Sequence, residues 1–481
     1  MFFVNSPSIG QVRRPPPSRG LPNIHRKICH NFRPYRRKCF RKFAFNFGGT
    51  RYNTKKGFCP AFSCDRRASK EPRARQASHK WTAVFRAARQ GGYRMSREDR
   101  YPWRFSLFLA AYYIANSVYQ GYISVYFSDK GLDSARIGML MSAVSLVSIV
   151  SQPTWGMLGD RSSSRNRVLR IMCVLAAGAI LLLPLGGNLW YLSCVLCLFA
   201  ASYTAIQPMG DSVILEALQK RHQPFGPIRL LGTYAFAVAS IFAGRLMDGH
   251  LERVPILTAG ILGFVFLSTF FLPPTVGHAR KKSSASIFAL MRDRKLMLLI
   301  GLVTLLQTTL GYFYVFFPVY FTKMPGGNSS LLGWAFFLSA ASETPFLLLS
   351  DRLFEKLGVG KLLLIAAASL TARWVILALT DNVWVAMASQ LLHGWGFIVM
   401  TVTMAKYISM TVPEELRARG QMLLAVSGFG VARVLGNLGG GWIGQAIGLK
   451  ATFGLMAGLA FLSLLAFAPL YLKREPHGGK T

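Results

Sequence analysis

The chain is poor in acidic residues, with 19 Asp and Glu against 56 Lys and Arg among its 481 residues and a formal net charge of +37. It also lacks a cluster of metal ligands, a glycine-rich phosphate-binding loop and a turn that would present a nucleophilic serine. These absences predict a protein that is not an enzyme and that uses neither a metal nor a cofactor.

The first 94 residues contain no apolar run long enough for the core of a signal peptide. They hold 23 Lys and Arg against two acids, and four of the seven cysteines, whose spacings of ten and five positions fit no usual zinc site. Zinc binding by these cysteines is therefore the weaker of two functional interpretations of this segment. The other is nucleic-acid binding through the arginine-rich residues 33–42. We favour a third, in which residues 1–94 are a basic, disordered or non-native extension and the natural start is Met95.

From residue 105 onward the sequence is organised in twelve apolar segments, each long enough to cross a hydrocarbon core of ~30 Å. In lipid the backbone N–H and C=O groups must form their hydrogen bonds with one another, so these segments are expected to be helices. The predicted fold is an all-α membrane protein with twelve transmembrane helices. Residues 274–296 form a central loop between two six-helix halves, residues 95–273 and 297–481. The segments are 105–127, 137–158, 168–186, 189–213, 228–247, 254–273, 297–321, 331–350, 361–380, 384–410, 420–445 and 450–472.

Lys and Arg are concentrated in the loops on one side of these segments. Because such loops stay in the cytoplasm, both termini are predicted to be cytoplasmic in a multi-pass plasma-membrane protein. The basic loop residues on that side are Arg161, Arg165, Arg167, Lys220, Arg221, Arg280, Lys281, Lys282, Arg292, Arg294, Lys295, Arg352, Lys356, Arg417 and Arg419.

A Gly-x-x-x-Asp-Arg string connects the second and third segments, and a weaker copy appears 191 residues later. We expect a tight hairpin in which glycines let the helix ends approach and the carboxylate of Asp160 caps the next helix. The copy indicates that the protein is built twice, and both strings are candidates for a conformational-switch loop. The residues concerned are Gly156, Asp160, Arg161, Asp351 and Arg352.

Four ionisable residues lie near the middle of neighbouring second-half segments, namely Glu343, Arg373, His393 and Arg433. A charge at the centre of a membrane helix costs about 2.5–3.5 kcal/mol on insertion scales, so each of them needs a reason. A shared polar cavity is one reason, and buried ion pairs that only fix packing are another. In the first interpretation Glu343 either pairs with Arg373 or takes up a proton, which is what proton coupling requires.

The first half carries a similar pair, because antiparallel fourth and fifth helices would bring Asp211 and Arg229 to the same depth. Asn116 and Gln120 are candidate cavity walls, as are Gln207 and Gln390. Amides in membrane helices are as often bonds between helices, and both interpretations stay open.

Residues 156–167 resemble the hallmark loop of the major facilitator superfamily. Pro208-x-x-Asp211, followed by Phe225-Gly226-x-x-Arg229, is similar to the branch with lactose permease, nucleoside–proton symporters and phenylpropionate permeases. This resemblance covers residues 95–481 and implies substrate and proton roles at Asp211, Arg229, Glu343, Arg373 and His393. Gly396 stands where lactose permease has its proton-carrying glutamate, a departure that favours a phenylpropionate-permease-like protein over a sugar transporter.

Three functions follow as hypotheses. The first is proton-coupled uptake of a small organic solute (an organic or aromatic acid, a sugar or a nucleoside) across the bacterial inner membrane by alternating access. The second is an efflux antiporter for drugs or metabolites, and the third is a membrane sensor or nucleic-acid tether. For the first, we expect a monomer in the lipid bilayer whose partners are the solute and protons, with no nucleic acid.

Overall fold

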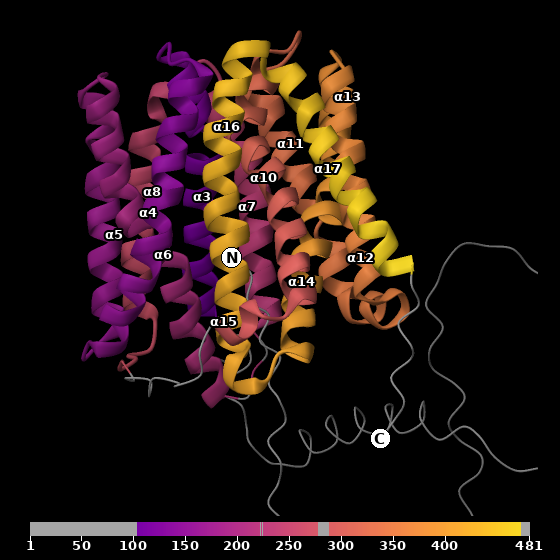
Figure 1. The fold of residues 1–481 in the computed structure, drawn as a ribbon. Helices are drawn as coiled ribbons and strands as arrows, with labels where there is room; N and C mark the ends of the chain where they lie inside the picture. Colours follow the sequence, from indigo (N-terminus) through magenta and orange to yellow (C-terminus); the bar gives the residue numbers. More distant parts are fainter. Residues whose placement is uncertain (1–102, 222, 224, 278–287, 473–481) are drawn as a thin grey trace, which may run out of the picture. The chain divides into compact units, whose positions relative to one another are not determined.

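The computed structural model describes residues 103–221, 223, 225–277 and 288–472 (Figure 1). The expectations for residues 1–94 and for a start at Met95 lie outside the described residues, as do Arg280, Lys281 and Lys282 of the central connection. Every regular element in the described ranges is a helix.

Six long helices form the first half, and short polar side chains begin several of them. Asp133 caps α4 by accepting a hydrogen bond from the backbone N–H of Arg136, and Ser164 and Asn188 cap α5 and α6 in the same way. Short 3₁₀ turns extend α5 and α8. The helices are α3 (Trp103–Asp129), α4 (Ser134–Arg161), α5 (Arg165–Leu181), α6 (Leu189–Lys220), α7 (Gly226–Met247) and α8 (Val254–Ser268).

The short α9 precedes the second half, which contains several interrupted spans. α12 holds the end of one span and the whole of the next, because Gly358 adopts a left-handed backbone (φ 71°) that turns the chain. The helices are α9 (Phe288–Met291), α10 (Arg294–Lys323), α11 (Ser329–Ala341), α12 (Thr344–Leu379), α13 (Val383–Ala388), α14 (Val399–Thr411), α15 (Glu414–Ala425), α16 (Ala432–Ile447) and α17 (Leu449–Leu472).

Within the described residues, ten helices or merged helices are long and apolar enough to cross a membrane. One of them, Ser329–Leu379, is two spans because it turns at Gly358, and α3 is the remaining span. The fold is therefore all-α, with twelve transmembrane helices in two six-helix halves, as the sequence predicts. Most helices begin and end within a few residues of the predicted segments.

Two spans of the second half are broken at the same depth. α11 ends at Ala341 and α12 begins at Thr344, which leaves Glu343 at the junction. A 3₁₀ turn before His393 and a π-helical turn after it interrupt the span made of α13 and α14. The backbone N–H of Gly394 donates to Ser342 Oγ at 2.9 Å, so the two breaks touch. A methyl group at Gly394 would meet the Ser342 carbonyl, so only glycine allows this approach.

The two halves meet through α4 with α16 and through α7 with α11. Ser142 donates to the Val434 carbonyl at 3.2 Å. On the same face a methyl group at Gly138 would meet the backbone of Asn437 and Gly441. These contacts lie toward the ends of the helices that are remote from the α4–α5 connection. We call the end with that connection the basic end, and the other the far end.

Candidate functional site in a central cavity

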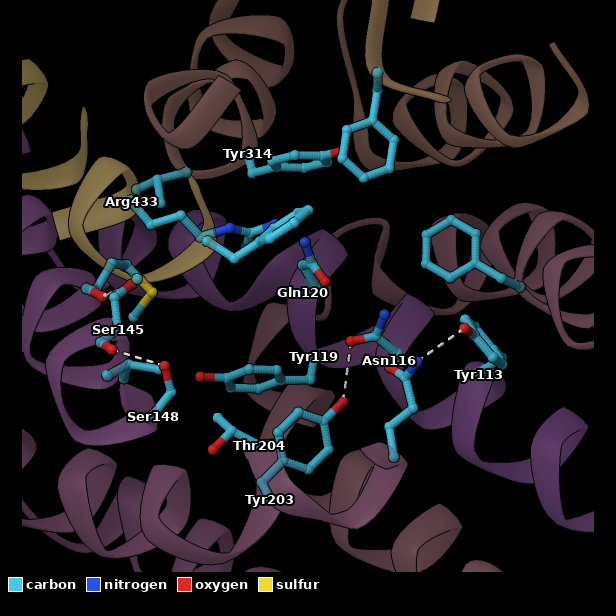
Figure 2. A pocket seen from close by; sticks show the side chains of 18 of the residues that line it. Tyr113, Asn116, Tyr119, Gln120, Ser145, Ser148, Tyr203, Thr204, Tyr314 and Arg433 are labelled. Carbon is cyan, nitrogen blue, oxygen red and sulfur yellow. Dashed lines mark hydrogen bonds between the residues drawn. The ribbon is translucent and has the colours of Figure 1, made fainter. Parts of the chain in front are cut away.

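A cavity of about 590 Å³ lies between the two halves (Figure 2). Residues of α3, α4, α6 and α7 line it from the first half. From the second half it is lined by residues of α10, α11, α15 and α16 and by residues at the helix breaks, among them Glu343 and His393. The lining includes Gln152 of α4 and Met422 of α15, so the cavity extends from the middle of the bundle toward the basic end. Contacts between the halves close the far end.

In the second half, His393 lies between Glu343 and Arg373. The guanidinium of Arg373 is 2.9 Å from His393 Nδ1, and Glu343 Oε1 is 3.4 Å from His393 Nε2. All three side chains are buried, and Arg373 is fully so. A direct Glu343–Arg373 ion pair, one of the two states expected from the sequence, is not formed in this structure. The break at Glu343 and the hydrogen bond from Arg373 to Gln390 direct the two charges to opposite edges of the imidazole.

The contact with Arg373 fixes the protonation of the His393 ring. A guanidinium only donates hydrogen bonds, so Nδ1 of His393 must be the acceptor and carries no proton. The imidazole is then neutral with its proton on Nε2, which faces both the Glu343 carboxylate and the Tyr314 hydroxyl at 3.2 Å. His393 therefore contacts both the Glu343 carboxylate and the buried cation Arg373.

Asp211 and Arg229 form the predicted pair in the first half, with 3.5 Å between the guanidinium and the carboxylate. Gln207 lies beside them, and its amide fits with the oxygen toward Arg229, at 2.7 and 2.9 Å from the two terminal nitrogens. The guanidinium also covers the Tyr113 ring, with 4.9 Å from its carbon to the ring centroid. Arg229 lines the cavity, whereas Asp211 stands behind it.

Arg433 and three of the four predicted amides, Asn116, Gln120 and Gln207, also line the cavity (Figure 2). The guanidinium of Arg433 lies over the Tyr314 ring, 4.9 Å from its centroid. Asn116 accepts a hydrogen bond from the Tyr203 hydroxyl at 3.1 Å, which joins α3 to α6 beside the cavity. Gln120 lines the wall one turn further along α3. Of the residues that the sequence predicts for the cavity, all line it except Asp211, Arg373 and Gln390.

Aromatic side chains make up much of the cavity wall, and this was missed at the level of sequence. The lining includes Tyr112, Tyr113, Tyr119, Tyr203, Phe236, Phe313, Tyr314, Phe336, Phe397 and Phe429. Aromatic residues in a membrane helix cannot be told from ordinary apolar core residues, so their number in the sequence does not indicate a cavity wall. The available signal was the composition of α3, which carries five tyrosines together with Asn116 and Gln120.

At the basic end Asp160 does not cap α5, because Ser164 occupies the cap position. Asp160 instead binds Arg165 at 2.6 Å, and Arg165 also binds Glu216 of α6 at 2.9 Å. The sequence interpretation named Asp160 but gave Arg165 no role beyond its charge. This cluster, centred on the buried Arg165, joins α4, α5 and α6 within one half.

The two other residues of the first string, Gly156 and Arg161, are not buried. A methyl group at Gly156 would meet nothing within 4 Å, whereas one at Gly159 would meet Met209 of α6. The close approach of helix ends is therefore made at Gly159. In the second string, Asp351 binds Lys406 of α14 at 2.7 Å across the surface, and Arg352 is exposed.

The segment after α8 is hydrogen-bonded to the α4–α5 connection. Asn166 donates to the carbonyl of Pro273 at 3.0 Å and accepts from the hydroxyl of Thr275 at 2.9 Å. The backbone N–H of Arg165 donates to the Thr275 carbonyl at 3.0 Å. The start of the central connection is therefore anchored to the basic end of the first half.

A twelve-helix bundle with a polar cavity between two halves defines a membrane transporter rather than a soluble binding protein. Among the described residues, no group of three or more His, Cys, Asp or Glu could hold a metal ion. Residues 102–455 match the model of the MFS_1 like family. The chain belongs to this family of the major facilitator superfamily.

Relatives of the chain include permeases for several solutes. It is 27% identical to the maltose permease of Geobacillus stearothermophilus over 78% of this chain and 96% of that protein. It is 25% identical to an Escherichia coli K12 protein named "Probable 3-phenylpropionic acid transporter", over 75% and 94% of the two chains. A solved structure of the nucleoside transporter NupG shares the fold at a TM-score of 0.68, with 18% identity over 77% of this chain and 99% of NupG.

Proposed function

We propose that the protein takes up a small organic solute (an organic acid, a sugar or a nucleoside) together with a proton, by alternating access. The observation that carries this proposal is the row Glu343–His393–Arg373 at two touching helix breaks beside the cavity. At a break in a membrane helix, backbone N–H and C=O groups are free to bind a ligand or an ion. In a continuous helix these groups are hydrogen-bonded to one another. The relatives named for solute transport agree with this class of function.

The carboxylate of Glu343 is the proposed proton carrier. It is buried at the junction of α11 and α12, lines the cavity and lies 3.4 Å from His393 Nε2. A proton on Glu343 removes the negative charge that faces His393 Nε2 and leaves Arg373 without its counter-charge. The solute and the proton would then affect one another's affinity by the same factor, as linkage requires.

The basic end is the proposed cytoplasmic side of the inner membrane, because its loops carry the excess of Lys and Arg. On this assignment the structure is an inward-facing state, with the far end closed by α4–α16 and α7–α11 and the cavity extended toward the cytoplasm. Opening the α4–α16 and α7–α11 contacts would give the outward-facing state. The protein acts as a monomer in this proposal, since both halves of the cavity come from one chain.

Transport by purified protein in vesicles with an imposed proton gradient tests this function. A symporter accumulates solute when the outer medium is acidic, and Glu343→Gln should abolish that accumulation while exchange of internal for external solute continues. Glu252→Gln, at an exposed site in the α7–α8 connection, is the matched control and should transport normally. Accumulation by Glu343→Gln equal to that of the unmodified protein would remove Glu343 as the carrier.

Drug or metabolite efflux is the second candidate, because the aromatic cavity wall would also accept apolar compounds. The same vesicles distinguish the two functions. An antiporter accumulates solute when the lumen is acidic and not when the outer medium is.

A further inference from the structure

Arg433 is a cation in the cavity wall to which the proposed proton coupling gives no role. Its guanidinium lies over the Tyr314 ring at the cavity surface, 4.9 Å from the centroid (Figure 2). It forms no ion pair or hydrogen bond with any of the residues that the structure describes. Its side chain is partly exposed within the cavity. A guanidinium placed there is available to the carboxylate of a bound ligand.

The other two arginines of the region each have a carboxylate. Arg229 has Asp211 at 3.5 Å, and Arg373 has Glu343 on the far edge of the His393 ring. With His393 neutral, these two sets sum to zero charge, and Arg433 leaves the cavity one negative charge short. The solute itself is the group that can supply this charge.

We propose that the transported solute is an organic monoanion whose carboxylate binds Arg433 and whose flat apolar body lies against the aromatic wall. This rests on the proposed transport function and selects one class among its solutes. Guanidinium and carboxylate match in shape and form paired hydrogen bonds. The cavity walls are rich in flat rings, including Tyr119 and Tyr203 with centroids 5.1 Å apart, and they favour a planar body over a sugar.

Tyr314 links this anion site to the proton carrier. Its ring lies under Arg433, and its hydroxyl is 3.2 Å from the same His393 Nε2 that faces Glu343. An anion on Arg433 and a proton on Glu343 therefore occupy the two ends of one row of contacts. Because their charges cancel, one proton carried with one monoanion should be electroneutral, and its rate insensitive to membrane potential.

The experiment compares 3-phenylpropionate and benzoate with their neutral amides, by binding to the purified protein without any gradient. The unmodified protein should bind each carboxylate more tightly than its amide. Arg433→Gln should weaken carboxylate binding by about tenfold or more and leave amide binding nearly unchanged. Arg433→Lys, which keeps the charge, should lie between them, and Arg136→Gln at an exposed site is the control.

Carboxylates that bind no better than their amides, or not at all, would overturn the assignment of an organic anion. An equal loss of both ligands in Arg433→Gln, with normal behaviour of Arg433→Lys, would make Arg433 a structural residue and also overturn it. The proposed proton coupling fails separately, since it is read only from vesicles with a gradient. A protein that prefers carboxylates but ignores the gradient would keep this inference and lose the coupling.

Discussion

The imidazole ring of His393 lies edge-on between Arg373 and Glu343. Its Nδ1 is 2.9 Å from the guanidinium and its Nε2 is 3.4 Å from the carboxylate. The two charges therefore stabilise each other through a neutral group whose tautomer the cation dictates. A direct ion pair would hold the carboxylate more firmly and make it harder to protonate. The intervening ring keeps Arg373 out of direct contact with Glu343, which suits the proposed role of this carboxylate as a proton carrier.

Neutralising one member of this row should destabilise the protein more than neutralising both. Arg373→Gln strands Glu343, and Glu343→Gln strands Arg373, at a cost of about 3–5 kcal/mol for an uncompensated buried charge. The double variant removes both charges and should recover part of the thermal stability of Arg373→Gln, without recovering proton coupling. The melting temperatures in detergent of the three variants check this. A double variant less stable than either single variant would contradict the proposal that Glu343 and Arg373 compensate each other's charge.

The acidic residues of the two repeated strings should differ in importance. Asp160 binds Arg165, whose side chain is only 10% exposed, whereas Asp351 is 87% exposed where it meets Lys406. Asp160→Asn should therefore lower stability by about 1–3 kcal/mol and slow transport with little change in solute affinity. Asp351→Asn should stay within about 1 kcal/mol. Unfolding and transport rates of both variants give the test, and equal effects would contradict it.

Closure of the far end should depend on Gly138. A side chain there meets the backbone of Asn437 and Gly441, which cannot move aside easily. Gly138→Val should therefore disfavour the closed far end and expose a cysteine placed at Ser142 to a water-soluble thiol reagent. Gly156→Ala is the matched control, because its surroundings are open. It should leave labelling unchanged and, as an alanine inside a helix, stabilise by about 0.5–1 kcal/mol.

Asn166 should stabilise the basic end of the first half. Its amide bonds to the carbonyls of Leu272 and Pro273 and to Thr275, all in the segment after α8. Asn166→Ala leaves these buried groups without partners, at a cost of about 1–3 kcal/mol. Faster proteolysis within residues 272–277 would be the direct measure. Asn188→Ala, which removes an exposed helix cap, is the comparison and should leave proteolysis of that segment unchanged.

Much of the fold could be predicted because lipid allows few alternatives. Long apolar runs must be helices, and their turns follow from charge and glycine, so the twelve spans were recognisable from residue 105 onward. The Asp211–Arg229 pair was equally accessible, since a short connection between antiparallel helices fixes the depth of both residues. Whether these residues bind solute remains a proposal.

The internal connections of the second half were not accessible in the same way. The position of His393 between Glu343 and Arg373 depends on the break at Glu343 and the π-helical turn after His393, and neither departs visibly from helical periodicity. The burial of Arg165 depends on two acids from different helices, Asp160 and Glu216. Such arrangements need the three-dimensional contact between segments that are 51 or 52 residues apart in sequence.

The polar character of α3 has a consequence for how the protein enters the membrane. α3 supplies Asn116, Gln120 and three tyrosines to the cavity, and its hydropathy is lower than that of the other spans. The translocon admits a segment according to its summed transfer free energy, so a helix with this composition inserts poorly by itself. α7 and α8, which are synthesised later, pack against it. We therefore expect its stable integration to depend on them. Residues that shape the cavity thereby make early biogenesis of the protein depend on completion of its first half.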